Sequence, residues 1–143
     1  MFFMLLAAAA VYPTYTTYRD SPLVIDVPAG ARQTEPGSFR MIRGGLSTTF
    51  DMSFSMPHVD LRNPDCEGRQ PAYRLDKPDL FAWSCQIGST IRYHVEKYGR
   101  TSRMGASYST ELIEFTIRYP AAQKNYWNPV VTHISRSLHF ARE

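Results

Sequence analysis

The sequence lacks the short patterns that mark the most common catalytic and metal sites. It has no G-x-S-x-G turn for a serine nucleophile, no C-x-x-C pair and no D-x-[DN]-x-[DN]-G calcium loop. No two of its histidines are spaced so that both would lie on one face of a helix. We therefore expect a protein that is not an enzyme and that holds no metal and no cofactor.

Charge is missing from the first 18 residues, and the first 12, MFFMLLAAAAVY, are almost wholly apolar. This run is too short to span a bilayer, which takes about 20 residues. Its apolar stretch and its alanines at 8–10 are typical of a signal peptide, although the basic leader is missing. We predict that residues 1–18 are a signal peptide or an N-terminal anchor and that residues 19–143 form one domain. A buried N-terminal strand or helix is the alternative.

Cysteine is scarce, since Cys66 and Cys85 are the only two. An even number of cysteines in an exported chain favours a disulfide, and we predict one between them. Two free thiols in a reducing compartment are the alternative. Cysteine catalysis with His94 is a weaker hypothesis, because a disulfide and a surface strand account for both partners.

The chain does contain alternating hydrophobic and polar residues, which indicate β-strands. In residues 90–98, Ile91, Tyr93 and Val95 are expected to face inward and the residues between them to face solvent. Residues 13–22 and 99–107 are expected to be a linker and a polar loop, and residues 57–79 a long irregular insert. The expected strands cover residues 23–27, 38–43, 49–56, 80–87, 90–98 and 109–119.

After Pro120 the hydrophobic spacing becomes helical, because Val130, Val131, Ile134 and Leu138 fall on one helical face. Asn128-Pro129 is a good N-cap followed by a proline at the first helical position. The helix is expected to begin near residue 121 or 129 and to end near 138. The predicted fold class is α+β, with an antiparallel sheet of five to six strands and the C-terminal helix packed on one face.

Two charged segments are the candidate contact surfaces for a protein partner. The first is the insert, which the disulfide would hold against the sheet, and the second is the basic loop after residue 96. Paired carboxylates in the insert could also serve a small hydrolase, but the neighbouring arginines would neutralise them. The predicted partner-binding residues are Asp65, Glu67, Arg69, Tyr73, Arg74, Lys97, Arg100 and Arg103.

The C-terminal residues EFTIRYPAAQKNYWNPVVTHISRSLHF resemble the end of small PsbP-like α+β domains. The matching residues are Phe115-Thr116-Ile117 in a last strand, Asn128-Pro129-Val130-Val131 at the start of a helix, and Ile134 with Ser137-Leu138 at its end. The resemblance implies an antiparallel sheet covered by a helix and an accessory or partner-binding role. In size, export signal and lack of a catalytic set, the chain also resembles the periplasmic immunity proteins of type VI secretion.

The functional expectation is a non-catalytic exported module that binds another protein, such as a toxin that it neutralises. The alternatives are an envelope accessory subunit anchored by the N-terminal segment, and a small carboxylate-dependent hydrolase. We expect a periplasmic location, or the inner membrane if that segment is retained. No nucleic-acid partner is expected, because the net charge is only +3 and no dense basic stripe appears.

Overall fold

The computed structural model describes residues 13–57 and 62–142, and this part of the chain has an α+β fold. It contains two antiparallel sheets and one C-terminal α-helix. In chain order the elements are β1 (Tyr15–Asp20), β2 (Leu23–Pro28), β3 (Arg32–Glu35), β4 (Ser38–Arg43), β5 (Leu46–Ser55), β6 (Tyr73–Lys77), β7 (Leu80–Ile87), β8 (Thr90–Met104), β9 (Ser107–Pro120), the 3-10 helix η1 (Ala121–Gln123), α1 (Lys124–Ser137) and β10 (His139–Phe140).

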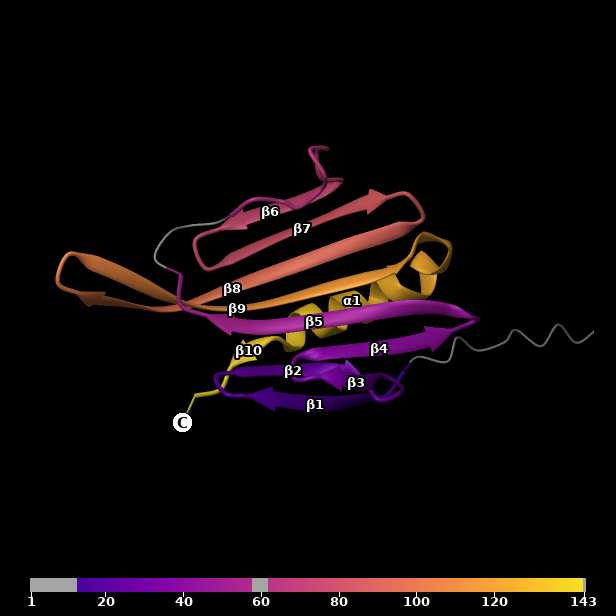
Figure 1. Cartoon of the computed structure of the whole chain (residues 1–143), viewed down its shortest axis with the longest axis horizontal. Coiled ribbons are helices and arrows are strands. Elements are labelled where there is room, and N and C mark those ends of the chain that lie inside the picture. Colours follow the sequence, from indigo (N-terminus) through magenta and orange to yellow (C-terminus); the bar gives the residue numbers. More distant parts are fainter. Residues whose placement is uncertain (1–12, 58–61, 143) are drawn as a thin grey trace, which may run out of the picture.

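The larger sheet has seven strands in the order β3-β4-β5-β9-β8-β7-β6, and the smaller has three in the order β1-β2-β10. Figure 1 shows α1 behind the larger sheet and β1 and β2 along its lower side. The expected number of five to six strands is therefore wrong. The missed strands are β1 in the supposed linker, β6 in the supposed irregular insert, and β3 and β10, which are too short to show a period of two.

Strand β1 includes the last residues of the predicted N-terminal segment 1–18. It begins at Tyr15 and pairs along its whole length with β2. The Tyr15 ring stacks on His133 of α1, with 3.7 Å between ring centroids. The structure thus uses residues 15–18 in the fold, whereas the apolar residues 1–12 lie outside the described part of the chain.

Helix α1 begins at the earlier of its two expected starts. The 3-10 helix η1 follows Pro120 directly and α1 continues from Lys124, so Pro129 lies inside the helix rather than at its first position. The Asn128 side chain accepts a hydrogen bond from the Tyr119 hydroxyl at 3.3 Å and is not the N-cap. The additional turn before Pro129 buries Trp127 completely, and this packing overrides the local capping signal.

The main core lies between α1, β2 and one face of the larger sheet. The helix residues predicted to face the core are all buried: Val130, Val131, Ile134 and Leu138. On β5, Phe50 and Met52 are buried as the alternation predicted, but Phe54 is 40% exposed. The alternation identifies the face on which a side chain lies, but not how far the covering helix reaches along that face.

A second, smaller hydrophobic cluster lies on the opposite face of the larger sheet. It consists of Cys66, Phe81, Trp83 and Cys85, all buried. Phe81 and Trp83 pair with Glu96 and His94 of β8, so they share this outer face with the polar residues of that strand. The outer face is therefore partly covered, and the loop that contains Cys66 is what covers it.

Burial of tyrosines around the core predicts a loss of stability at alkaline pH. Burial is the main cause that raises the pKa of Tyr15, Tyr93 and Tyr119 above the ordinary value of 10. A raised folded-state pKa gives stability that is complete below about pH 10 and is lost as the pH rises through the folded pKa. Burial lowers the pKa of Lys97. Between this lowered pKa and 10.5, Lys97 therefore increases the free energy of unfolding as the pH rises, which opposes the effect of the tyrosines.

We therefore expect the free energy of unfolding, measured by urea titration at intervals from pH 8 to 11, to fall above pH 10. The Tyr119→Phe variant, which cannot ionise at this position, should show a shallower fall. A free energy of unfolding that stays constant or rises between pH 10 and 11 would contradict this prediction.

The β8–β9 hairpin continues well beyond the rest of the sheet (Figure 1, orange). Strand β7 pairs with β8 only as far as Lys97, and β5 pairs with β9 only from Leu112 onward. After a shift in register, residues 101–110 pair only with each other. We call residues 101–110 the arm. The polar loop predicted over 99–107 is thus mostly strand, and the chain reverses at residues 105–106.

Within the described part of the chain, no further strand pairs with either edge of the larger sheet, although Arg62 donates to the carbonyl oxygen of Lys77 at the β6 edge. Strand β3, with the sequence RQTE, pairs only with β4, and all four of its residues are exposed. Strand β6, with the sequence YRLDK, pairs only with β7 and exposes all but Leu75. Both edge strands are short and rich in charge.

Candidate functional site

The outer face of the larger sheet brings together polar residues from neighbouring strands. His94 and Glu96 follow each other on one face of β8 because side chains alternate along a strand. Glu114 of β9 lies directly opposite Glu96 in the antiparallel ladder, and Thr116 lies opposite His94. We call His94, Glu96 and Glu114 the His-Glu cluster.

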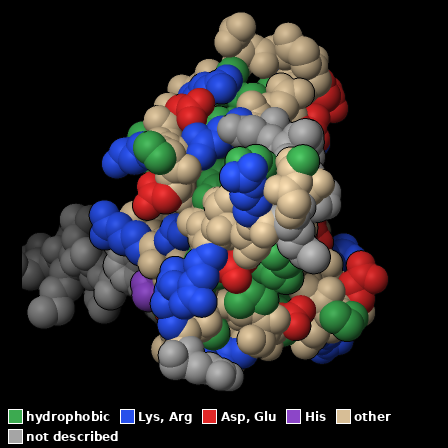
Figure 2. Space-filling view, turned by 90° about the vertical axis from the view of Figure 1, so that its left-hand side faces the viewer, with side chains coloured by type: hydrophobic (Ala, Val, Ile, Leu, Met, Phe, Trp, Pro, Cys, Tyr) green, Lys and Arg blue, Asp and Glu red, His purple; other side chains and the backbone are tan. Residues whose placement is uncertain are grey.

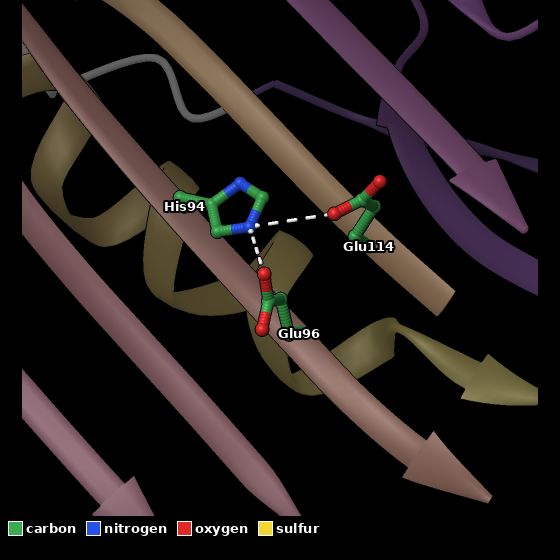
Figure 3. Close-up of side chains that lie close together, drawn as sticks. All are labelled: His94, Glu96 and Glu114. Carbon is green, nitrogen blue, oxygen red and sulfur yellow. Dashed lines mark hydrogen bonds and ion pairs between the residues drawn. The ribbon is translucent and has the colours of Figure 1, made fainter. Parts of the chain in front are cut away.

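The three members of the His-Glu cluster point toward one another (Figure 3). The Nε2 atom of His94 lies 3.1 Å from Oε1 of Glu96 and 3.5 Å from Oε2 of Glu114. His94 is 9% exposed and Glu96 7%, so both are buried. This contradicts the sequence expectation that these two residues face solvent on a surface strand.

Each member of the His-Glu cluster has one further polar side-chain atom, and a different neighbouring residue forms a hydrogen bond with each of these atoms. The Nδ1 atom of His94 lies 2.6 Å from the Thr116 hydroxyl, and Ser53 donates to Oε1 of Glu114 at 2.9 Å. Tyr98 donates its hydroxyl to Oε2 of Glu96 at 2.6 Å. Burial, followed by the hydrogen bond to Glu96 and its charge, raises the pKa of the Tyr98 phenol far above its ordinary value.

The cluster borders a hollow of about 240 Å³ in the outer face. The Trp83 ring stacks against His94 with 5.3 Å between ring centroids and closes one side. Arg118 forms an ion pair with Asp51 at 3.2 Å. The other residues around the hollow are Asn63, Asp65, Arg92, Thr116 and Arg118. The hollow is therefore lined by carboxylates, one imidazole and two guanidinium groups, and each guanidinium group is paired with an aspartate.

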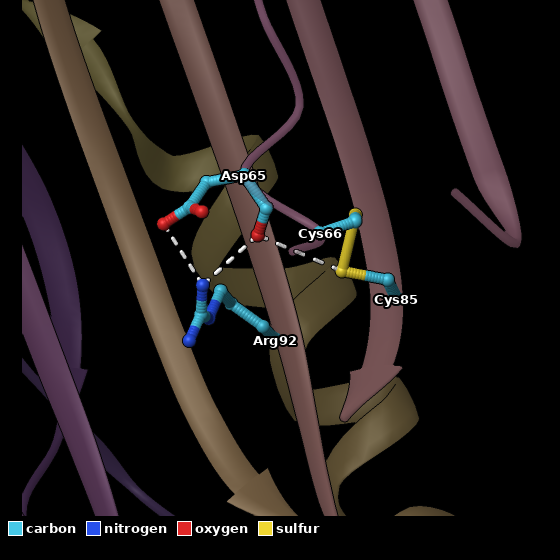
Figure 4. The surroundings of a disulfide bond; sticks show 4 residues. All are labelled: Asp65, Cys66, Cys85 and Arg92. Atoms are coloured by element: carbon cyan, nitrogen blue, oxygen red, sulfur yellow. Dashed lines mark hydrogen bonds and ion pairs between the residues drawn. A yellow bond between two sulfur atoms is a disulfide. The ribbon is translucent and has the colours of Figure 1, made fainter. Parts of the chain in front are cut away.

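Cys66 and Cys85 form the predicted disulfide, with 6.0 Å between their Cα atoms. It fixes the 62–72 loop to β7, next to the hollow (Figure 4). Arg92 Nη1 donates at 2.9 Å both to the carbonyl oxygen and to Oδ2 of Asp65. Asp65, a predicted partner-binding residue, thus contributes to holding the loop in place.

The other predicted contact residues of the insert are spread over different surfaces. Glu67 and Arg69 are exposed in the turn after Cys66. Tyr73 and Arg74 lie on β6 and point to opposite faces of the sheet. Tyr73 stacks on Tyr93 on the helix side, beside an open groove of about 740 Å³ between α1 and the sheet, whereas Arg74 pairs with Asp76 on the outer side at 3.3 Å.

The predicted basic segment is also divided between two surfaces. Lys97 is half-buried on the helix side, where its amino group donates to the carbonyl oxygens of Ser135 and Leu138 at the end of α1. Arg100 and Arg103 are exposed, at the base of the arm and within it. The structure therefore does not bring the insert residues and the basic residues into one surface.

Sequence reasoning missed the His-Glu cluster. The spacing of two between His94 and Glu96 shows that they share a face, and this signal was available. The register that sets Glu114 opposite Glu96 and the loop that covers them are not readable from a single strand. The predicted role of His94, paired with a free Cys85, is excluded by the disulfide.

The comparisons give no identification: no family model matches the chain, and no curated protein or solved structure was found to match it. The resemblances to PsbP-like domains and to immunity proteins therefore stay predictions. Among the helices of residues 13–57 and 62–142, none is long and apolar enough to cross a membrane.

Proposed function

We propose that the protein is a non-catalytic exported module that binds another protein through its arm. The observation that carries the proposal is the projection of residues 101–110 beyond the other strands of the larger sheet; among the described residues no third strand pairs with them. An isolated two-stranded hairpin is at best marginally stable in water. An arm of this kind adds little to the core, whereas it offers a narrow element that can enter a cleft in a partner.

The chemistry of the arm indicates the kind of partner surface that it fits. The arm contains Arg103 and no acidic residue, and Arg100 lies at its base, where its backbone N–H donates to the Glu111 carboxylate at 3.2 Å. The guanidinium group of Arg103 lies 5.2 Å from the ring centroid of Tyr108, which is 50% exposed. Figure 2 looks onto this end of the molecule, where Lys and Arg side chains lie mainly on the left half with Asp and Glu side chains among them. Arg and Tyr are the types enriched at binding hot spots, and a basic arm favours an acidic cleft.

The partner class in this proposal is a secreted toxin that the protein neutralises, with the arm occluding an acidic cleft. The sequence profile of a small exported domain supports this class. The exposed turn with Glu67 and Arg69 lies away from the arm, so we do not include it in the contact surface.

Charge reversal in the arm and at its base tests the proposal. We expect the tagged wild-type protein to recover one stoichiometric partner from its native periplasmic extract. The variant Arg100→Glu with Arg103→Glu should bind that partner at least about 10-fold more weakly, because opposed like charges replace complementary ones. Titration calorimetry with the purified partner measures the change. Co-expression should also protect cells from the toxin candidates encoded beside the gene.

The matched control is Arg19→Glu with Arg32→Glu, which changes the net charge by the same amount at exposed positions on β1 and β3. This control should bind like the wild type. Recovery of no stoichiometric partner, or equal weakening by both double variants, would overturn the assignment to the arm.

A further inference from the structure

We propose that the His-Glu cluster binds one divalent transition-metal ion, with His94, Glu96 and Glu114 as its ligands. Each residue offers one ligand atom, and the three atoms lie within 4.8 Å of one another. With metal-ligand bonds of about 2.1 Å, neighbouring ligands lie about 3.0 to 3.4 Å apart. The two imidazole-carboxylate distances, 3.1 and 3.5 Å, are already close to these separations. Small carboxylate rotations would complete the site.

The hydrogen bonds outside the cluster support this inference independently of the distances. A ligating histidine usually donates its other ring N–H to an oxygen acceptor, and ligating carboxylates are themselves hydrogen-bonded. Here Thr116, Tyr98 and Ser53 each take the outer polar atom of one cluster member. These outer contacts leave His94 Nε2, Glu96 Oε1 and Glu114 Oε2 facing one another. A metal site has the same arrangement, with the ligand atoms pointing inward and their other polar atoms hydrogen-bonded outside.

The charges of the cluster give a further reason to expect a cation. Glu96 and Glu114 are directly opposite on adjacent strands, where like charges destabilise a sheet. A proton on His94 would offset one of the two negative charges, whereas a divalent ion would offset both. A protonated His94 that bridges the two carboxylates is the competing explanation, and the experiment below separates the two.

The donor set selects a class of metal. One imidazole nitrogen and two carboxylate oxygens suit Zn²⁺, Co²⁺, Mn²⁺ or Fe²⁺ better than a soft ion such as Cu⁺. Three protein ligands leave at least one coordination position open toward the hollow. Arg92 and Arg118 also line that hollow, but each is already in an ion pair, with Asp65 and Asp51, so neither selects an anion at the open position. The inference does not depend on the arm or on its partner.

Cobalt titration of the untagged full-length protein, after removal of metal by a chelator, tests the site. We expect a visible absorption band that saturates at one equivalent of Co²⁺ and is displaced by Zn²⁺. His94→Ala should weaken Co²⁺ binding at least about 100-fold, and Thr116→Val about 10- to 100-fold, as is typical of a residue that orients a ligand. Glu114→Gln preserves the shape of the side chain and should also weaken Co²⁺ binding. It tests the site independently if the His94→Ala variant does not fold.

The matched control is His133→Ala, which removes a histidine from another imidazole-carboxylate pair, with Asp26 at 2.9 Å on the outside of α1. This variant should bind Co²⁺ like the wild type. The absence of a saturable band at one equivalent, or equal binding by wild type and His94→Ala, would overturn the proposal in favour of a protonated His94.

Discussion

Replacing Trp127 with alanine is expected to lower the free energy of unfolding by about 3 to 5 kcal/mol, the range for removing a fully buried tryptophan. The Trp127 side chain is 0% exposed and lies where α1 meets the larger sheet. Its ring packs edge-on against Phe50, with 5.8 Å between ring centroids, and its Nε1 donates to Gln123 at 3.1 Å. The substitution would leave a cavity that the rigid sheet cannot close.

Urea unfolding followed by far-UV circular dichroism measures this effect without relying on tryptophan fluorescence. Tyr108→Ala in the arm is the control, because it shortens an aromatic side chain that is 50% exposed and outside the core. It should change the free energy of unfolding by no more than about 0.5 kcal/mol. A loss of less than about 1 kcal/mol for Trp127→Ala would contradict the assignment of Trp127 to the core.

Removing the disulfide is the second large effect. The double variant Cys66→Ala with Cys85→Ala is expected to lose about 3 kcal/mol, the loop-entropy value for a closed loop of about 20 residues. The disulfide fixes Cys66 to β7, and Asn63 and Asp65, just before it in the chain, lie beside Trp83 and His94. The loss should therefore be accompanied by easier local opening of the outer face.

Urea unfolding with and without dithiothreitol separates the disulfide from other effects of the substitutions. The wild type should lose stability when reduced, whereas the double variant should be indifferent to the reductant. Hydrogen exchange should show faster exchange for the backbone amide of Arg69, which donates to the Cys66 carbonyl. If reduction leaves the unfolding curve of the wild type unchanged, the prediction is wrong.

Those parts of the fold that bury an alternating or helical pattern could be predicted from the sequence. Phe115 and Ile117 on β9, and Ile134 on α1, lie on the predicted buried faces. The missed strands have no such pattern, because none of their residues is fully buried and pairing with a neighbouring strand holds them in place. The start of α1 was ambiguous because burial of Trp127 competes with the local signal at Asn128.

The candidate site was less predictable, since it depends on contacts between segments distant in sequence. Glu114 is 18 positions from Glu96, and only the register of β8 with β9 sets them opposite each other. The outward direction of His94 and Glu96 was correctly expected, but their burial depends on a loop held by the disulfide. The projection of the arm could not be predicted for a similar reason. It depends on β5 and β7 not extending along residues 101–110 of the β8–β9 hairpin, which the sequence of the hairpin itself does not show.

The two open edges of the larger sheet have a consequence for how molecules of this protein meet one another in solution. An unpaired edge is a template on which a second copy could add its own strand. Both edge strands are short and expose charged side chains, Arg32 and Glu35 on β3 and Arg74 and Lys77 on β6, which are features that discourage such pairing. The charge and shortness of these strands therefore discourage the growth of the sheet from molecule to molecule into fibrils.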